Sequence, residues 1–280
     1  MGIDLYCVMG NPVAHSRSPW IHARFAELTG QTLRYDRRLI PMEGFATSVR
    51  AFAAEGGRGC NITVPFKFDA AVLADCVSER ATLAGAVNVL SFQGGAILGD
   101  NTDGAGLVID LQRNAGFDLR GHQVLLIGAG GAAAGVLGPL LHEHPASITV
   151  ANRTLARASV LVARHAELAA QMEVELVGRS LLDLRGNFDL VINATSASLS
   201  EAGIPVAGST LKRGALAYDM MYGAPAQGFL TWAAEHGASA RDGLGMLVGQ
   251  AAEAFLIWRG VMPPEQQVLD ELRAVMQERS

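Results

Sequence analysis

Residues 121–154 read GHQVLLIGAGGAAAGVLGPLLHEHPASITVANRT, and this stretch decides the fold of the chain. An apolar strand at 124–127 leads into a glycine turn, an alanine-rich helix and a second apolar strand at 148–151. This is the order of a dinucleotide-binding βαβ unit. Gly128 can make the tight turn, and Gly130 lets backbone N–H groups approach a pyrophosphate at the N-terminus of the helix. The stretch therefore predicts a Rossmann-type nucleotide site.

The residues after the second strand indicate NADP as the cofactor. An NAD site usually has Asp or Glu roughly 20 residues past the turn, where it holds the ribose 2′-hydroxyl. This chain has Asn152, Arg153 and Thr154 there, and Arg157 lies one helical turn beyond Arg153. Two guanidinium groups without a carboxylate suit a 2′-phosphate. The alternative is a glycine-rich turn in another kind of α/β protein, followed by ordinary surface arginines.

Composition favours a two-domain protein that binds small molecules. The 280 residues, 50% of them hydrophobic, can bury a large core. The net charge of −5 argues against non-specific nucleic-acid binding. The chain has neither an apolar run long enough to span a membrane nor an N-terminal signal pattern, so we expect a cytoplasmic monomer or homodimer without membrane contact. Cys7, Cys60 and Cys76 are scattered, which indicates neither a disulfide framework nor a zinc site.

Strands and helices alternate on both sides of the nucleotide unit, which predicts an α/β fold. Before it we expect strands at 3–9, 34–40, 60–64, 87–92 and 96–99, with helices at 18–28, 42–54, 66–75 and 103–114. The last two strands read as a hairpin, and Ser18 reads as the N-cap of the first helix. After it we expect strands at 174–177, 188–193 and 215–219, with helices at 225–235, 244–258 and 268–276. The final helices would return to the first domain and make it discontinuous.

Two polar clusters lie where expected strands of the first domain end. NITVPFK, residues 61–67, places Thr63 near a strand end and Lys67 just past a proline turn. Ligands of α/β sheets bind at such strand ends, and a lysine there can donate a proton to a substrate oxygen. An exposed lysine at a helix start is the alternative. GDNTDG, residues 99–104, holds four polar side chains up to Asp103, which is more than a helix cap needs, so its function stays open.

Two further clusters combine polar side chains with helix starts or glycines. In HSRSP, residues 15–19, Ser16 and Ser18 can both point at a ligand carboxylate, although an ordinary cap explains Ser18. In DGLGMLVGQ, residues 242–250, Gly243 permits close backbone approach and Gln250 projects from the following helix. A glycine-rich loop followed by a solvated glutamine is the alternative.

Together these motifs resemble those of shikimate dehydrogenases. GNPVAHSRSP, NITVPFK, AGAVNV, GDNTDG, GAGGA, NRT, NATS, YDMMY and DGLGMLVGQ follow one another in the order of that family. Its members are NADP-dependent enzymes that reduce 3-dehydroshikimate to shikimate in aromatic amino-acid biosynthesis. The resemblance implies an N-terminal α/β substrate-binding domain with a mixed sheet, residues 1–103 and 245–280. It also implies a Rossmann-type NADP-binding domain, residues 104–244.

The resemblance further implies the role of each site residue. Lys67 matches the catalytic lysine that delivers a proton, and Asp103 matches its aspartate partner, which also binds a substrate hydroxyl. Further substrate ligands are implied at Ser16, Ser18, Thr63, Asn88, Tyr222 and Gln250, the two serines holding the carboxylate. Cofactor contacts are implied at Gly128, Ala129, Gly130, Gly131, Ala132, Asn152, Arg153, Thr154, Arg157, Thr195, Met220 and Gly243. No metal is implied.

The chain departs from the family pattern in three places. Ala133-Ala134 stand where many members have Arg, which puts one phosphate contact in doubt. Val89 replaces a common Thr, and the loop after NATS reads SASLS without a glycine. Quinate and amino-shikimate are the alternative substrates, but quinate use tends to accompany Thr at the position of Ser18. A non-catalytic NADP-binding protein is the less favoured reading, because the lysine and its aspartate partner are both present.

Overall fold

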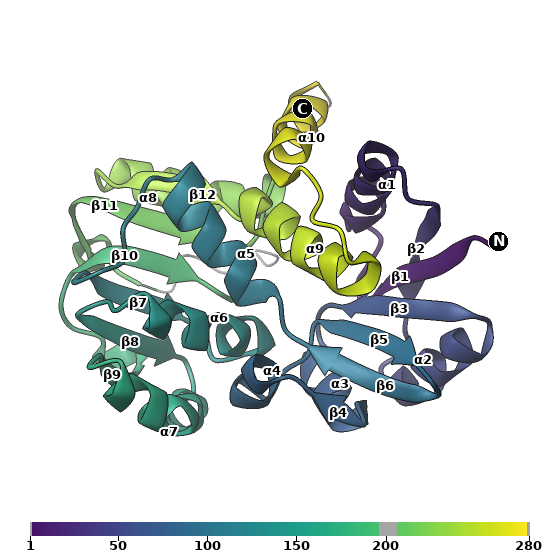
Figure 1. Ribbon diagram of the computed structural model, residues 1–280. Helices are drawn as coiled ribbons and strands as arrows, with labels where there is room; N and C mark the ends of the chain where they lie inside the picture. The colour runs from purple at the N-terminus through teal and green to yellow at the C-terminus, as the bar shows by residue number, and fades with distance from the viewer. Residues whose placement is uncertain (1, 196–205, 279–280) are drawn as a thin grey trace. The chain divides into compact units, whose positions relative to one another are not determined.

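The computed structural model describes residues 2–195 and 206–278 and divides the chain into two compact units (Figure 1). The first unit contains residues 1–106 and 247–280, and the second contains residues 107–246. The chain passes from the first unit to the second within helix α5 (Asp103–Ile109) and returns within helix α9 (Leu244–Arg259). In the part of the chain that is described, no helix is long and apolar enough to cross a membrane.

The first unit is built on a mixed six-stranded sheet of order β2-β1-β3-β5-β6-β4. Strand β1 pairs in parallel with β2 and β3, whereas β5 runs antiparallel to both β3 and β6. The strands are β1 (Asp4–Gly10), β2 (Leu33–Leu39), β3 (Gly57–Ile62), β4 (Cys76–Val77), β5 (Val89–Gln93) and β6 (Ala96–Asp100). The helices are α1 (Ser18–Thr29), α2 (Phe45–Ala54), α3 (Lys67–Leu73), α4 (Glu79–Ala84), the start of α5, most of α9, and α10 (Glu265–Gln277).

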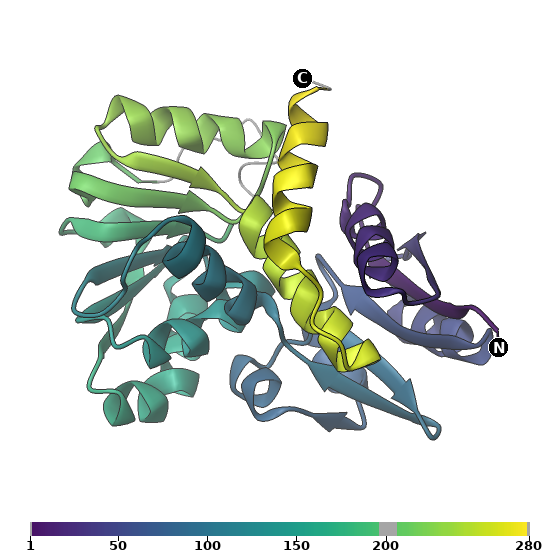
Figure 2. The ribbon, with the colours of Figure 1, turned by 45° about the horizontal axis from the view of Figure 1, so that its top comes forward.

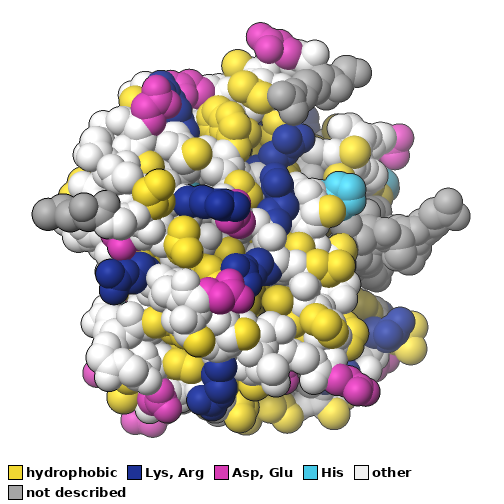
Figure 3. Space-filling view, turned by 90° about the vertical axis from the view of Figure 1, so that its right-hand side faces the viewer, with side chains coloured by type: hydrophobic (Ala, Val, Ile, Leu, Met, Phe, Trp, Pro, Cys, Tyr) yellow, Lys and Arg dark blue, Asp and Glu magenta, His cyan; other side chains and the backbone are white. Residues whose placement is uncertain are grey.

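The C-terminal helix α10 completes the first unit by packing against α1. Figures 1 and 2 both show the two helices side by side. Arg24 on α1 holds the carboxylate of Glu271 on α10 through Nε at 2.6 Å and Nη2 at 2.9 Å. Arg259 and Arg58 likewise share the carboxylate of Asp4. On the face drawn in Figure 3, basic and acidic side chains are interspersed among apolar and neutral ones.

The second unit is built on six parallel strands of order β12-β11-β10-β7-β8-β9. This is the doubly wound order of a Rossmann fold, in which the strand order reverses between the two central strands, here β7 and β10. The strands are β7 (Gln123–Ile127), β8 (Ser147–Asn152), β9 (Glu175–Ser180), β10 (Phe188–Asn193), β11 (Leu211–Asp219) and β12 (Ser239–Asp242). The helices are α6 (Gly131–His142), α7 (Leu155–Gln171) and α8 (Gln227–Glu235). The predicted α/β fold with a Rossmann-type sheet is confirmed.

The central strands of the second unit are apolar on both faces, because helices cover both sides of a parallel sheet. Val124 to Ile127 of β7 and Leu190 to Ile192 of β10 are fully buried. The same unit also buries the carboxylates of Asp110 and Asp219, and the first shows how such a charge is accommodated. Asp110 is joined to a guanidinium and a phenol. Arg241 holds it with an Nη2–Oδ1 distance of 2.7 Å, and Tyr218 Oη donates to its Oδ2 at 2.7 Å, so the charge is both paired and hydrogen-bonded.

Several element boundaries differ from the sequence-based expectation. The helix expected at 103–114 is α-helical only to Ile109 and continues as a π-helical turn, Asp110–Asn114. The segment expected to be helical from 225 begins as a 3₁₀ turn, Ala224–Ala226, and further 3₁₀ turns lie at Leu181–Asp183 and Gly208–Thr210. Helix α4 and the short strands β4 and β12 were not expected, because segments of two to six residues carry little periodicity.

The expected N-cap of the first helix is wrong. Ser18 is already the first residue of α1, and Arg17 occupies the cap position without a side-chain hydrogen bond. Instead, Ser16 Oγ accepts the backbone N–H of Ser18 at 3.3 Å. The hydroxyl that satisfies the helix start therefore comes from the first serine, not the second.

Helix α1 buries one histidine in an aromatic cluster of the first unit. His22 is fully buried and stacks on Tyr35, with ring centroids 4.2 Å apart and planes inclined by 5°. Phe25 and Trp258 also lie against its ring. Burial disfavours the charged imidazolium and lowers the pKa of His22 from 6.5 to about 3. The folded protein therefore holds His22 neutral at pH values where the unfolded chain protonates it.

This difference makes stability depend on pH. Between pH 6.5 and about 3 the unfolded chain binds the additional proton, so the contribution of His22 is complete above pH 6.5 and falls as the pH falls. We predict that His22→Phe reduces the slope of unfolding free energy against pH in this window by up to about 1.4 kcal/mol per pH unit. Urea unfolding followed by circular dichroism at several pH values measures the slope. The exposed His142→Phe variant is the control, and equal slopes for wild type and His22→Phe would contradict the prediction.

Candidate functional site

The polar clusters of the first unit meet at one edge of its sheet. Strands β1, β3 and β6 end at this edge, and β5 begins there because it is antiparallel to its neighbours. Two backbone hydrogen bonds join the loops, from Asn11 N–H to Val64 O at 2.9 Å and from Asn88 N–H to Asp100 O at 3.0 Å. Gly10 is needed for this approach, because a Cβ at that position would lie 2.2 Å from Thr63 Cγ2.

Lys67 and Asp103 form an ion pair at this edge. Lys67 is the first residue of α3 and Asp103 the first residue of α5, and Lys67 Nζ donates to Asp103 Oδ2. The two side chains are only 13% and 6% exposed. The Lys67 carbonyl also accepts the N–H of Val87 at 2.8 Å, which fixes the start of α3. This placement excludes the alternative of an exposed lysine at a helix start.

The amide of Asn88 connects Asp103 to two other segments. Its Nδ2 lies 2.9 Å from Asp103 Oδ1, 3.0 Å from Thr102 Oγ1 and 3.3 Å from Gln250 Oε1. Its Oδ1 accepts the N–H of Thr102 at 2.8 Å. Gln250 is 8% exposed and donates to Leu247 O at 2.8 Å, so the alternative of a solvated glutamine is wrong. Helix α9 packs this side chain inward, which the sequence alone did not show.

The two serines lie beside each other at the start of α1. Ser16 Oγ donates to Ser18 Oγ at 3.1 Å. Arg37 on β2 fixes the Ser16 backbone by donating from Nε and Nη2 to its carbonyl at 2.8 and 2.5 Å. Thr63, which follows β3, donates its N–H to Met9 O at 2.9 Å and is half-buried. Nothing near Arg37 in the sequence marks this role, because its partner is a backbone carbonyl 21 residues away.

The glycine turn of the second unit has the geometry expected of a phosphate-binding turn. Gly128 has a φ of +112°, and a Cβ there would lie 3.1 Å from both Ala194 O and Thr195 Cγ2. Gly130 is the N-cap residue of the twelve-residue helix α6, and a Cβ there would meet nothing within 4 Å. Within residues 2–195 and 206–278, no side chain caps this helix start. The turn therefore combines open space with helix-terminal N–H donors, as an anion site requires.

The other implied cofactor residues follow strands that end at the same edge of this parallel sheet. Asn152 Nδ2 donates to Thr154 O at 2.9 Å and holds the loop after β8. Arg153 and Arg157 are exposed, and neither pairs with a carboxylate among the residues that the structure describes. Ala133 and Ala134 are buried, and their side chains provide no donor to a phosphate.

The loops after β10, β11 and β12 are also joined. Thr195 Oγ1 donates to Asn193 Oδ1 at 2.7 Å, and Met220 N–H donates to Asn193 O at 3.0 Å. Gly243 is sterically required, since a Cβ would lie 2.4 Å from Met220 O. Tyr222 follows β11 in the second unit, whereas the other implied substrate ligands belong to the first. The SASLS loop lies outside the described residues.

The described residues show no cluster of three or more His, Cys, Asp or Glu side chains that could hold a metal ion. The polar groups at the two sheet edges suit organic ligands. The first unit offers hydroxyls, amides and one ammonium, which suit a small polyhydroxylated acid. The second offers helix-terminal N–H groups and guanidiniums, which suit phosphates.

Three family models match the chain. Residues 8–90 match the shikimate dehydrogenase substrate binding domain, residues 110–201 match shikimate / quinate 5-dehydrogenase, and residues 243–273 match the shikimate 5′-dehydrogenase C-terminal domain. Among curated proteins, shikimate dehydrogenase (NADP(+)) of Acidovorax sp. strain JS42 is 64% identical over 273 residues, which are 98% of this chain and 97% of the relative.

Two solved structures are similar along nearly the whole chain. An Ael1 enzyme from Pseudomonas putida is 44% identical with a TM-score of 0.86, covering 96% of this chain and 98% of that one. The shikimate 5-dehydrogenase of Thermus thermophilus, solved with NADP(H) and shikimate, is 29% identical with a TM-score of 0.82, covering 97% and 99%.

The Asn88 network predicts a specific cost of losing its amide. Asn88→Leu keeps the approximate shape but leaves the N–H of Thr102 without its acceptor and Asp103 Oδ1 without this donor. We predict that the variant lowers the unfolding free energy by about 2–4 kcal/mol, because each unsatisfied buried polar group costs about 1–3 kcal/mol. Urea unfolding measures the loss. The exposed Asn187→Leu variant should change stability by less than about 0.5 kcal/mol, and similar losses in both variants would refute the assignment.

Proposed function

The chain belongs to the shikimate dehydrogenase family, and from this membership we propose how its residues divide the reaction among themselves. The protein is an NADP-dependent oxidoreductase that reversibly reduces 3-dehydroshikimate to shikimate in aromatic amino-acid biosynthesis. The observation that carries the assignment of roles is the ion pair of Lys67 with Asp103 at the carboxyl edge of the first sheet.

Lys67 is the proton donor in this proposal. When bound, NADPH supplies a hydride to the ring carbonyl carbon. Lys67 Nζ delivers a proton to the carbonyl oxygen as negative charge develops there, and takes the proton back in the reverse direction. Asp103 orients Nζ through Oδ2, and its other oxygen is held by Asn88. The carboxylate can then accept a hydroxyl of the substrate while it fixes the lysine.

The substrate is held by groups from several elements. Ser16 and Ser18, whose hydroxyls adjoin, bind the carboxylate, and Thr63, Asn88, Tyr222 and Gln250 bind ring hydroxyls. Ser18 is buried, and it is a serine at the position where threonine tends to accompany quinate use in this family. This supports shikimate over quinate, which carries one further hydroxyl on the carbon that bears the carboxylate.

NADP fits the edge of the second sheet. The space beside Gly130 and the uncapped N-terminus of α6 suit the pyrophosphate, which Gly128, Ala129, Gly131 and Ala132 would also contact. The two exposed arginines after β8 suit the 2′-phosphate, with Asn152 and Thr154 shaping their loop. Thr195, Met220 and Gly243, on the neighbouring loops, would border the nicotinamide half of the cofactor.

The enzyme is proposed to act in the cytoplasm as a monomer or homodimer. Its three cysteines are free, two of them buried, which is typical of a protein in a reducing compartment. Light scattering combined with size-exclusion chromatography distinguishes a monomer or a dimer from any larger assembly.

Loss of the lysine tests the catalytic assignment. We predict that Lys67→Met lowers kcat for shikimate oxidation by about 10²- to 10⁴-fold, the usual effect of removing a general acid–base group. Initial rates of NADPH formation measure this, first with shikimate and then with quinate. Lys212→Met, at the only other lysine of the sequence, removes a pair with Asp189 and should leave kcat unchanged. An unchanged kcat in Lys67→Met would disprove the assignment, and faster turnover of quinate would overturn the substrate.

Loss of the arginines tests cofactor selection. We predict that Arg153→Ala and Arg157→Ala each raise the KM for NADP by about 10- to 100-fold, since a charged hydrogen bond is worth about 1.5–3 kcal/mol. The KM for NAD, which lacks the 2′-phosphate, should stay constant. Arg164→Ala, an exposed arginine further along α7, is the matched control. Parallel changes in both cofactors would argue against recognition of the 2′-phosphate.

A further inference from the structure

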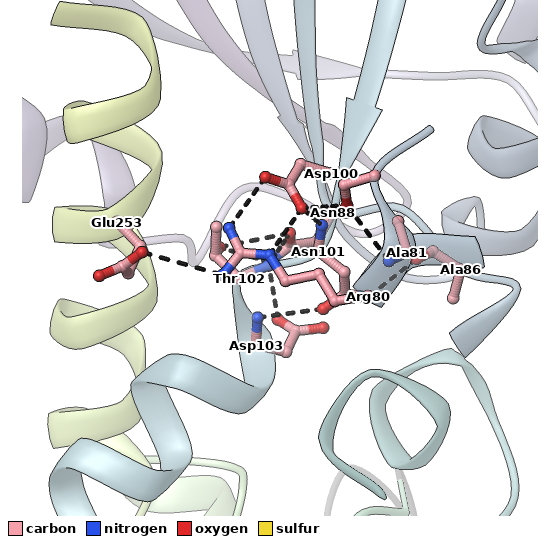
Figure 4. Close-up of polar contacts among 10 residues, drawn as sticks. Arg80, Ala81, Ala86, Asn88, Asp100, Asn101, Thr102, Asp103 and Glu253 are labelled. Carbon is pink, nitrogen blue, oxygen red and sulfur yellow. Dashed lines mark hydrogen bonds and ion pairs between the residues drawn. The ribbon is translucent and has the colours of Figure 1, made fainter. Parts of the chain in front are cut away.

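Four charged or hydroxyl side chains form a cluster next to the loop that carries Asp103. This cluster, here called the Arg80 clamp, consists of Ser78, Arg80, Asp100 and Glu253. Figure 4 labels the last three. Ser78 and Arg80 lie at the start of α4, Asp100 ends β6, and Glu253 lies on α9. None of the four has a role in the proposed reaction, yet the cluster joins three elements that border the site.

The carboxylate of Asp100 is the centre of the clamp. Arg80 binds it in bidentate fashion, with Nε 2.7 Å from Oδ1 and Nη2 2.8 Å from Oδ2. Ser78 Oγ donates to Oδ1 at 2.5 Å. Burial alone raises the pKa of Asp100, but the hydrogen bonds from Arg80 and Ser78 outweigh it and hold this pKa below its usual value. A planar guanidinium fork fixes both oxygens and hence the plane of the carboxylate.

Asp100 passes this orientation to the catalytic pair through Asn101. The Asn101 N–H donates to Asp100 Oδ1 at 2.7 Å, so the backbone leaving β6 is tied to the clamp. Asn101 is buried, donates from Nδ2 to Ala86 O at 2.8 Å and accepts the N–H of Asp103 on Oδ1 at 3.1 Å. A continuous series of hydrogen bonds therefore leads from Arg80 to the first residue of α5, whose carboxylate holds Lys67.

The clamp also reaches the helix that carries Gln250. Arg80 Nη1 lies 3.9 Å from Glu253 Oε2, and Glu253 follows Gln250 by three residues on α9. Residues three apart lie on one side of a helix. Gln250 in turn accepts from the Asn88 amide that holds Asp103. Arg80 thus contacts β6, which leads into the loop before Asp103, and α9, which presents Gln250 to Asn88.

We propose that Arg80 is a positioning residue for the Lys67–Asp103 pair, acting through Asp100 and Asn101. The inference rests on the function proposed for that pair. The arginine neutralises Asp100, so the loop from β6 to α5 can carry two carboxylates within four residues while only Asp103 is available to the lysine. Without the guanidinium, the Asp100 carboxylate loses its bidentate partner and the loop loses the constraint on where α5 begins.

Arg80→Gln tests this role, with Arg34→Gln as the matched control. Arg34 lies on β2 of the same unit and forms an exposed pair with Asp36. We expect Arg80→Gln to lower kcat with shikimate and NADP by about 10- to 100-fold, because a displacement near 1 Å at a reacting group costs up to about 10²-fold. The Kd for NADPH, measured by fluorescence titration, should stay constant. Arg80→Lys keeps the charge without the fork and should restore only part of the rate.

Each outcome separates positioning from a general structural role. If Arg80→Gln is folded and turns over like wild type, the inference is overturned. It is also overturned if kcat and NADPH affinity decline together, because that pattern indicates a general disturbance of the structure rather than displacement of Asp103. If Arg80→Gln does not fold, Arg80→Lys and Ser78→Ala decide the question, and wild-type kcat in both refutes it. Lys67→Met is measured in parallel: if it is fully active the catalytic role proposed for Lys67 fails, whereas if it is inactive and Arg80→Gln is active only the positioning role fails.

Discussion

The ion pair of Lys67 and Asp103 is the interaction on which the arrangement of the first unit depends. An ammonium group taken out of water is costly unless a carboxylate meets it, and that carboxylate needs further donors for its remaining lone pairs. Asn88, which directly precedes β5, provides one such donor through its side-chain amide. Asn88 must then satisfy its own oxygen, which it does with the N–H of Thr102. One desolvated charge at the sheet edge thus dictates a series of partners drawn from β5, α5 and α9.

The fold could be read from the sequence because its signals are local. Gly128 needs a positive φ and Gly130 needs open space, and both requirements leave a pattern within a few residues of each other. Apolar runs such as 124–127 and 188–193 indicate buried parallel strands for the same reason. The composition of residues 152–157 also indicated a phosphate partner from neighbouring residues alone. Patterns of this kind can be recognised without any knowledge of the tertiary structure.

Only part of the site could be predicted from the sequence, because most of the residues that contact one another there are distant in the sequence. Physical reasoning placed Thr63 and Lys67 at a strand end, but the pairing with Asp103 came from resemblance to a family. Gln250 looked like a solvated side chain, since nothing near it in the sequence shows that it packs against Asn88. Ser18 shows the opposite error. The local Ser-Pro pattern is typical of a helix cap, but in the structure Ser16 accepts the backbone N–H at the helix start. No local pattern marks Arg80, because its role depends on contacts with Asp100 and Glu253, which are distant in the sequence.

The antiparallel course of β5 has a consequence for engineering. Asn88 and Asp103 flank the β5–β6 hairpin, whose two strands start and finish at the site, so its tip at Gly94–Gly95 lies at the opposite edge of the sheet. Both glycines have positive φ, and a Cβ added at either would meet nothing within 4 Å. Exposed loop tips of small residues tolerate insertions better than any other part of a domain. A reporter peptide or an affinity tag grafted at this tip would be held by two strands whose other ends adjoin the site, and it would lie a full strand length away from the reacting groups.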